Sequence, residues 1–230
     1  MLTGKMCVVI GGAKGFGRLI LEEFAKRGCN VAFMDNDEES GEKEREYITA
    51  CFGVDAYYYH GNLHSEAERT MFACTIIDRY ERIDYLINNA CTNAFESALQ
   101  CNYDKPKALM WSCILGLYYF SNAFEEDFAP NVSIVNVIPS KETIIRNYGA
   151  SYYKEVKKNT EILTKTLLEE LGKDAHVYCV QPSLEKVKTP FGKPMDLADA
   201  VFFLCQERAD FLNGREFVID GSISKAIMQL

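Results

Sequence analysis

The stretch from Met6 to Gly28 constrains the fold more than any other part of the 230-residue chain. Four consecutive apolar residues run into a glycine-rich turn at 11–17, after which apolar residues recur at helical spacing. This pattern predicts a buried strand, a tight turn and a helix. Glycines let the backbone approach a ligand closely, and the free N–H groups at a helix start favour phosphate. The stretch indicates a dinucleotide site, with a purely structural turn as the alternative.

An acidic residue ends the next apolar segment. Residues 30–34 read as a second buried strand, and Asp35 follows them directly. A carboxylate about 20 residues beyond the glycines stands where the hydroxyls of a ribose would be held. The spacing strengthens the prediction of a dinucleotide site.

Strands and helices continue to alternate along the rest of the chain. Further strands are predicted at 56–60, 83–87, 132–138, 176–180 and 217–219, and helices at 37–51, 65–80, 107–128, 150–172 and 196–207. Seven buried strands with intervening helices predict an α/β fold, a doubly wound parallel sheet of the Rossmann type with helices on both faces. Because no linker or low-complexity run divides the sequence, we expect one domain over residues 1–230.

Composition argues against several classes of protein. The formal net charge of −8 is unsuited to a nucleic-acid or anionic membrane surface. No apolar run is long enough to span a bilayer and no signal peptide is recognisable, so we expect a cytoplasmic protein. The nine cysteines lack C-x-x-C pairs and companion histidines, which favours reduced thiols over disulfides or a metal site.

Polar segments follow two of the predicted strands. Gly61-Asn62-Leu63 follows the third strand and could contact an adenine ring, and Asn88-Asn89-Ala90 follows the fourth. Buried polar groups at the end of a strand are costly unless they bond something. The second segment is therefore either a turn network or the floor of a ligand site.

The residues best suited to chemistry follow the fifth predicted strand. Tyr153 and Lys157 are four apart on a predicted helix, so their side chains share one face. Ser140 lies thirteen residues before the tyrosine. An exposed helical pair without function is the alternative. Tyr152 is a poorer candidate, because the residue four positions beyond it is Val156.

These features together resemble the short-chain dehydrogenase/reductase family. The resemblance rests on the glycine turn, on Asn88-Asn89-Ala90, on Ser140 with Tyr153 and Lys157, and on the run LTKTLLEELG, and it covers nearly the whole chain. It implies an oxidoreductase that interconverts a carbonyl and a secondary alcohol by hydride transfer. Tyr153 would be the general acid or base, Ser140 would orient the carbonyl, and Lys157 would bind the nicotinamide ribose and lower the tyrosine pKa.

The resemblance also implies a set of cofactor-binding residues: Gly11, Lys14, Gly15, Phe16, Gly17, Asp35, Asn62, Leu63, Asn89, Ala90, Tyr153, Lys157, Pro182 and Thr189. Asp35 should accept both adenosine ribose hydroxyls and repel a 2′-phosphate, which predicts NAD(H) over NADP(H). Lys14 opposes this preference, because a basic residue just before Gly15 can neutralise that phosphate in NADP-using relatives.

Several positions depart from the family pattern. The asparagine of the family's N-x-x-G motif is Cys113 here, the glycine after Asn-Asn-Ala is Cys91, and the glycine after Pro182 is Ser183. The segment between Pro182 and the next predicted helix is also shorter than the family's substrate lid. These departures keep open a degenerate member that binds dinucleotide or a partner subunit without turnover. A structural α/β domain without any ligand is a third alternative.

The family pattern extends to assembly. Members usually form dimers or tetramers through the helices predicted here at 107–128 and 150–172. We therefore expect a homotetramer or homodimer that takes a small carbonyl or alcohol substrate.

Overall fold

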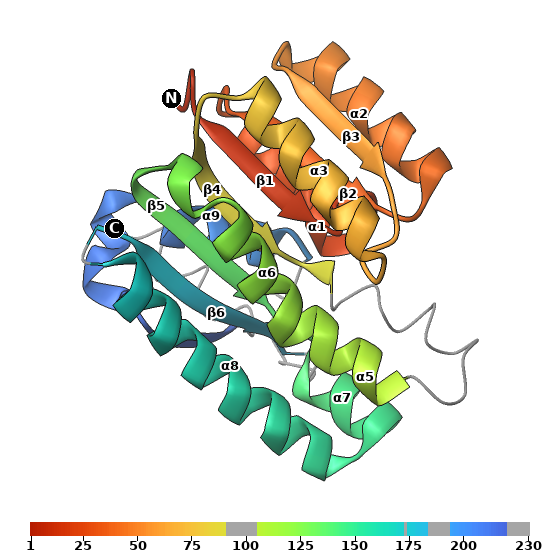
Figure 1. Ribbon diagram of the computed structural model, residues 1–230, viewed down its shortest axis with the longest axis vertical. Coiled ribbons are helices and arrows are strands. Elements are labelled where there is room, and N and C mark those ends of the chain that lie inside the picture. Colours follow the sequence, from red (N-terminus) through yellow and green to blue (C-terminus); the bar gives the residue numbers. More distant parts are fainter. Residues whose placement is uncertain (91–104, 173, 184–193, 220–230) are drawn as a thin grey trace.

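The structure of the protein is a computed structural model that describes residues 1–90, 105–172, 174–183 and 194–219 (Figure 1). Seven parallel strands form one sheet in the order β3-β2-β1-β4-β5-β6-β7. Their bounds are β1 (Met6–Ile10), β2 (Asn30–Asp35), β3 (Ala56–His60), β4 (Ile83–Asn88), β5 (Phe128–Val137), β6 (His176–Pro182) and β7 (Glu216–Ile219). The order reverses between β1 and β4, which confirms the predicted doubly wound sheet. The expected ligand site is therefore at the carboxyl ends of β1 and β4.

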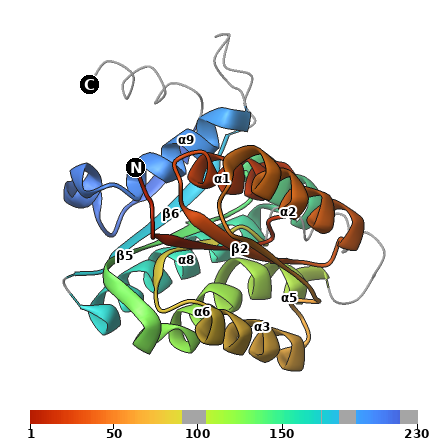
Figure 2. The same ribbon diagram turned by 90° about the horizontal axis from the view of Figure 1, so that it is seen from above.

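Helices cover both faces of the sheet (Figure 2). One layer holds α1 (Gly15–Ala25), α2 (Glu38–Phe52) and α9 (Pro194–Leu204), and the other holds α3 (Glu66–Arg79), α6 (Gly116–Ala123) and α8 (Ala150–Leu171). Successive strand residues point to opposite layers, so Val9 belongs to the core under α1 and Val8 to the core under α6. None of the helices in the described residues combines the length and the hydropathy that a membrane span requires.

The single helix predicted at 107–128 is divided in the structure. It consists of α5 (Lys105–Met110), a π-helical turn at Trp111–Leu115, and α6, and it is followed by a short 3-10 turn at Glu125–Asp127. The prediction was wrong after Ala123, because β5 begins at Phe128 instead of 132. The apolar residues of this segment do not reveal the division, because aromatic residues suit both a helix and a strand.

A helix that the sequence pattern did not predict follows β5. α7 (Lys141–Tyr148) begins after Ser140, whose side chain accepts a hydrogen bond from the Thr143 backbone N–H. It ends at Gly149, whose φ of 96° a residue with a side chain rarely adopts, and α8 starts directly afterwards. α7 packs beside the start of α8 (Figure 1). Near the C-terminus, the helix predicted at 196–207 ends earlier, at Leu204, and a 3-10 turn follows at Glu207–Leu212.

Candidate active site

The glycine turn after β1 is packed so closely that two of its positions exclude a side chain. Gly11 has a φ of 84°, and a Cβ there would lie 2.9 Å from the Cα of Ala90. A Cβ on Gly17, in the first turn of α1, would collide with the carbonyl oxygen of Gly11 and lie 2.7 Å from Nδ2 of Asn89. Glycine at these positions brings the start of α1 against the ends of β1 and β4.

Asn89 fastens this turn to β4. Its side chain is fully buried, and Nδ2 donates a hydrogen bond of 2.8 Å to the carbonyl oxygen of Gly11. Its backbone N–H donates to the carbonyl of Ile10 at 2.9 Å. Asn89 therefore belongs to a turn network, which is one of the two alternatives that the sequence left open. The backbone of Ala90 packs directly against Gly11.

Asp35 closes the same turn from β2. Its Oδ2 accepts a hydrogen bond of 3.0 Å from the Ala13 backbone N–H, and Oδ1 accepts one of 3.2 Å from the Asp37 N–H. Burial raises the pKa of the Asp35 carboxyl above its ordinary value, and these backbone donors oppose that effect. Lys14 forms an ion pair with Asp37. Phe16 is half-buried against the core beneath α1.

The turn after β3 lies level with Asp35 at this edge of the sheet. His60, the last residue of β3, pairs in register with Asp35, and Asn62 and Leu63 follow. The Asn62 Oδ1 accepts a hydrogen bond from the His64 backbone N–H at 2.9 Å, which stabilises the turn. Asn62 is exposed and Leu63 is half-buried, so both predicted adenine contacts lie at the surface beside the β2 end.

Two buried asparagines hold the π-helical turn that contains Cys113. The Asn88 Nδ2 donates to the carbonyl of Ser112 at 2.9 Å and to Oδ1 of Asn136 at 2.8 Å. The Asn136 Nδ2 donates to the carbonyl of Cys113 at 2.7 Å. A π turn leaves carbonyls without their usual helical partners, and the strand side chains satisfy them here. The π-helical turn is thus present although residue 113 is a cysteine instead of the family's asparagine.

Ser140 caps α7. Its hydroxyl is buried, lies 2.8 Å from Oγ1 of Thr143 and accepts a hydrogen bond of 3.1 Å from the Thr143 backbone N–H. It lies just beyond the carboxyl end of β5, which places it at the same edge of the sheet as the glycine turn.

Tyr153 and Lys157 lie one turn apart on α8, as predicted. The Tyr153 hydroxyl donates a hydrogen bond of 3.3 Å to Oε1 of Gln181, and Nζ of Lys157 lies 3.1 Å from Oε1 of Glu216. Gln181 is 2% exposed and belongs to β6, while Glu216 begins β7. The pair is therefore held by two strand residues that the sequence analysis did not single out.

The pKa of Tyr153 differs from the sequence expectation. Burial raises it above its ordinary value, Lys157 lowers it, and Glu216 and Glu142 raise it further. The predicted influence of Lys157 is present, but it does not determine the direction in the ligand-free protein. Burial lowers the Lys157 pKa, but the pairing with Glu216 and the influence of Tyr153 and Cys179 together outweigh burial, so the Lys157 pKa is raised.

The sequence profile of the short chain dehydrogenase family matches residues 5–198. The chain belongs to this family. Members of this oxidoreductase family bind nicotinamide dinucleotides and act on small carbonyl or alcohol substrates.

Known relatives agree over nearly the full length. A 3-oxoacyl-(acyl-carrier-protein) reductase of Chlamydia pneumoniae is 24% identical, with 97% of this chain and 98% of the relative aligned. The crystal structure of a short chain dehydrogenase from Burkholderia cenocepacia in complex with NADP has a TM-score of 0.79 at 21% identity, covering 97% and 99% of the two chains. An NAD⁺-bound xylitol dehydrogenase has a TM-score of 0.77 at 19% identity, covering 96% and 99%.

The glycine turn of this short-chain dehydrogenase fits a dinucleotide. Because Gly11 and Gly17 have no side chains, the backbone itself is close-packed at the start of α1. Lys14, which precedes α1, makes no side-chain cap. The N–H groups in the first turn of α1 can therefore donate hydrogen bonds to a phosphate. Pro182 is buried at the end of β6, at the same edge. Thr189 and Cys91, also named from the sequence, lie outside the described residues.

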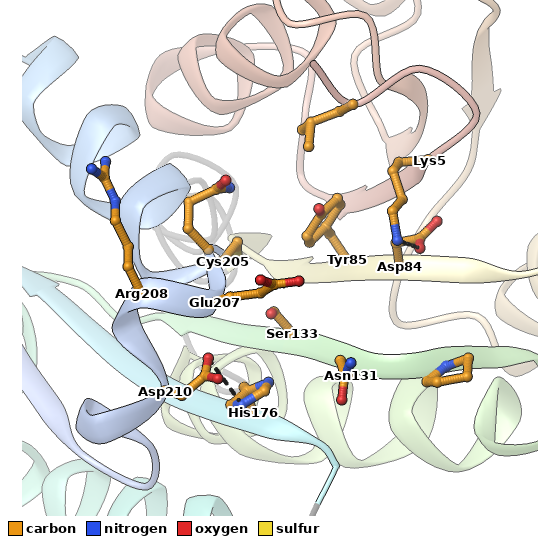
Figure 3. Close-up of a pocket in the computed structure, with 13 residues that line it drawn as sticks. Lys5, Asp84, Tyr85, Asn131, Ser133, His176, Cys205, Glu207, Arg208 and Asp210 are labelled. Carbon is orange, nitrogen blue, oxygen red and sulfur yellow. Dashed lines mark hydrogen bonds and ion pairs between the residues drawn. The ribbon is translucent and has the colours of Figure 1, made fainter.

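A separate cavity of about 520 Å³ lies at the opposite, amino-terminal edge of the sheet (Figure 3). Two polar pairs face it, an ion pair between Lys5 and Asp84 at 2.7 Å and a contact of 3.2 Å between Nε2 of His176 and Oδ1 of Asp210. The Asp84 Oδ2 also accepts a hydrogen bond of 2.9 Å from the Met6 backbone N–H. None of the predicted catalytic or cofactor residues that the structure describes lines this cavity, so the candidate active site is at the other edge. No cluster of three potential metal ligands occurs among the described residues.

One of the two missed residues had a signal in the sequence. Gln181 is a polar residue beside the apolar segment 176–180, and a polar side chain in a buried strand needs a partner. Glu216 offered none, since a glutamate at the start of a strand is usually solvated.

Proposed function

We propose that this short-chain dehydrogenase is an NAD(H)-dependent oxidoreductase that interconverts a carbonyl and a secondary alcohol. The observation that carries the proposal is the placement of Tyr153 and Lys157 on one face of α8, beside the sheet edge that also holds the glycine turn. The bound nicotinamide would supply or accept the hydride. A half-buried phenol and an ammonium group next to that edge provide the proton and the charge that the reaction needs.

Tyr153 would protonate the carbonyl oxygen, or remove the alcohol proton in the reverse direction. To do so its hydroxyl exchanges the Gln181 oxygen, 3.3 Å away, for the substrate oxygen. Ser140 would orient that oxygen. The Ser140 oxygen accepts from the Thr143 N–H, so its own proton is available to a substrate when the Thr143 hydroxyl donates to it.

Lys157 would bind the ribose next to the nicotinamide. An ammonium group has three donors, and the Lys157 ammonium forms an ion pair with Glu216. The remaining donors are enough for two ribose hydroxyls without loss of the ion pair. The positive charge beside Tyr153 also stabilises the phenolate that forms after proton transfer.

The preference for NAD(H) over NADP(H) follows from the charges at the end of β2. The Asp35 carboxylate accepts backbone N–H groups at both oxygens, and its two oxygens offer about four lone-pair sites, which leaves capacity for a ribose hydroxyl. The ion pair with Asp37 compensates the charge of Lys14, which would favour a 2′-phosphate. The similar structures named above include both an NADP and an NAD⁺ complex, so the argument rests on this chain's own residues.

The alternative is a degenerate member that binds dinucleotide or a partner subunit without turnover. Two observations favour it: the raised pKa of Tyr153, and the ion pair that holds Lys157 against Glu216. The retained Ser140, Tyr153 and Lys157 favour the enzyme, because a pure binder has no physical need for all three.

A substrate screen distinguishes the two. We expect NADH fluorescence to report binding, and NADH oxidation to occur with at least one member of a panel of ketones, sterols, acyl thioesters and sugars. Binding without oxidation of NADH by any carbonyl would support the degenerate binder. Absence of NADH binding would contradict the enzyme and the dinucleotide-binding form of the alternative, and would leave the form that binds a partner subunit.

We also propose that residues 1–230 form one domain and that the protein is a cytoplasmic homotetramer or homodimer. Exposed apolar side chains on the family's usual contact helices support assembly: Leu115 before α6, Tyr118 on it and Ile162 on α8. A subunit packed there would remove these side chains from water. A monomer in light scattering at micromolar concentration would contradict the proposed assembly.

A further inference from the structure

The candidate catalytic pair faces a second polar pair with matched spacing. Tyr153 and Lys157 are four residues apart on α8, a rise of about 6 Å. In the register between β6 and β7, Gln181 pairs with Val218 and Cys179 pairs with Glu216, so Glu216 lies two residues below the level of Gln181. Two residues of strand rise about 6.6 Å. The spacing of the two pairs therefore matches, so that Tyr153 contacts Gln181 and Lys157 contacts Glu216.

The orientation of the Gln181 amide is fixed by its second partner. Nε2 donates a hydrogen bond of 2.8 Å to the carbonyl oxygen of Pro139, and a carbonyl can only accept. Oε1 must then face Tyr153, whose hydroxyl donates to it. Because Pro139 directly precedes Ser140, Gln181 links the phenol to the backbone that carries the serine.

Glu216 is the carboxylate partner of Lys157. Its side chain is 19% exposed and that of Lys157 is 39% exposed, so the pair is neither buried nor freely solvated. The Glu216 carboxylate belongs to strand β7 and holds the Lys157 ammonium against the sheet. Tyr153, in contrast, lies on the same helix as Lys157.

We propose that Gln181 and Glu216 are positioning residues, Gln181 fixing the Tyr153 hydroxyl beside Ser140 and Glu216 fixing the Lys157 ammonium against the sheet. The role assigned to Tyr153 and Lys157 rests on the proposed function. The hydrogen bond and the ion pair themselves do not.

The arrangement has a defined effect on the Tyr153 proton. An acceptor oxygen at 3.3 Å favours the protonated phenol, because ionisation would leave that oxygen facing an anion. The charged groups that face Tyr153 are Lys157 from α8, Glu216 from β7 and Glu142 from α7. Removing the Gln181 acceptor or the Glu216 charge should each make Tyr153 easier to ionise.

The test uses the full chain with 3-fluorotyrosine at position 153, followed by ¹⁹F NMR against pH without cofactor or substrate. We expect Gln181→Met and Glu216→Gln each to lower the titration midpoint by about half a pH unit or more. Glu155→Gln is the matched control for charge, because Glu155 is an exposed residue of the same helix. Gln206→Met is the control for the loss of an amide, and both controls should leave the midpoint unchanged.

If Gln181→Met does not fold, Gln181→Asn replaces it. The shorter amide cannot reach both Tyr153 and Pro139, so the same downward shift is expected. Midpoints that stay at the wild-type value, or rise, in the Gln181 and Glu216 variants would overturn the proposal. NADH binding is measured separately by fluorescence. Wild-type protein that binds no NADH would contradict the proposed function, while the cofactor-free titrations would still decide the positioning roles.

Discussion

The two ends of the candidate site are built differently. At the glycine turn, Gly11 and Gly17 leave room for backbone, and Asn89 and Asp35 hold the turn through backbone groups. At the other end, Tyr153 and Lys157 are held by side chains from two further strands. A site built on backbone contacts loses its shape when a glycine gains a side chain. A site built on side-chain contacts can keep its shape when one residue type replaces another. The glycine turn, which is the proposed phosphate end, therefore keeps its family pattern, and the departures gather where the nicotinamide would lie.

The largest effect is expected at the catalytic end, from Tyr153→Phe. The substitution keeps the ring but removes the proton donor, so turnover should fall by about 10² to 10⁴. NADH affinity, measured by fluorescence, should stay nearly unchanged, because the phenol is not its main anchor. Tyr152→Phe is the control and should leave turnover intact. Activity that survives Tyr153→Phe would refute the assigned proton donor.

The next largest effect is expected at the phosphate end, from Gly17→Ala. The added methyl group would collide with the Gly11 carbonyl and crowd Asn89, forcing α1 away from β1. We expect NADH affinity to weaken by about 5- to 150-fold, since overpacking costs about 1–3 kcal/mol. Arg18→Ala, at an exposed neighbouring position, should have little effect in the same titration. Equal loss of affinity in both variants would show that the close packing is not the cause.

A smaller effect is expected for cofactor choice, from Asp35→Ala. Loss of the carboxylate removes its repulsion of a 2′-phosphate, worth at least about 1 kcal/mol near 4 Å. The ratio of NADPH to NADH dissociation constants should therefore fall by about tenfold. Lys14→Ala tests the opposing group and should move the ratio the other way. A wild-type protein that binds NADPH as tightly as NADH would contradict the assignment of Asp35.

The smallest effect is expected away from both ends, at Glu44 on α2. Burial raises the pKa of Glu44 to about 7, with Glu22 adding to the effect. The folded state thus binds this proton more tightly than the unfolded chain does. The stabilisation is complete below the ordinary glutamate pKa, falls as pH rises, and is lost above about 7. Glu44→Gln should raise the free energy of unfolding by about 1 kcal/mol at pH 8 but not at pH 4. Denaturant titrations check this, with exposed Glu46→Gln as control.

The difference between the two ends also explains what the sequence could predict. The alternation of strands and helices, the glycine turn and the helical face shared by Tyr153 and Lys157 follow from local patterns of apolar residues and glycines. The bond from Tyr153 to Gln181 joins residues 28 apart, and no local pattern reports such a contact. The rise in the Tyr153 pKa was missed for the same reason, since burial and Glu216 are properties of the folded chain.

Local signals were also overlooked. Ser140 as a helix cap and Gly149 as a helix end would together have indicated α7. The π-helical turn is different, because it depends on Asn88 and Asn136 from two strands, and a helix pattern alone does not contain it.

Strand β1 is fastened to β4 at both of its ends, by Asp84 on the Met6 N–H and by Asn89 on the Gly11 carbonyl, and each bond spans 78 residues of chain. Contacts this distant form slowly, because a long loop must close before they stabilise anything. On the ribosome, the glycine turn emerges well before the strand that completes it. The glycine turn therefore acquires its hydrogen bond from Asn89 only after β4 has been synthesised, and a nascent chain that stops at α3 should present the glycines without the proposed binding site.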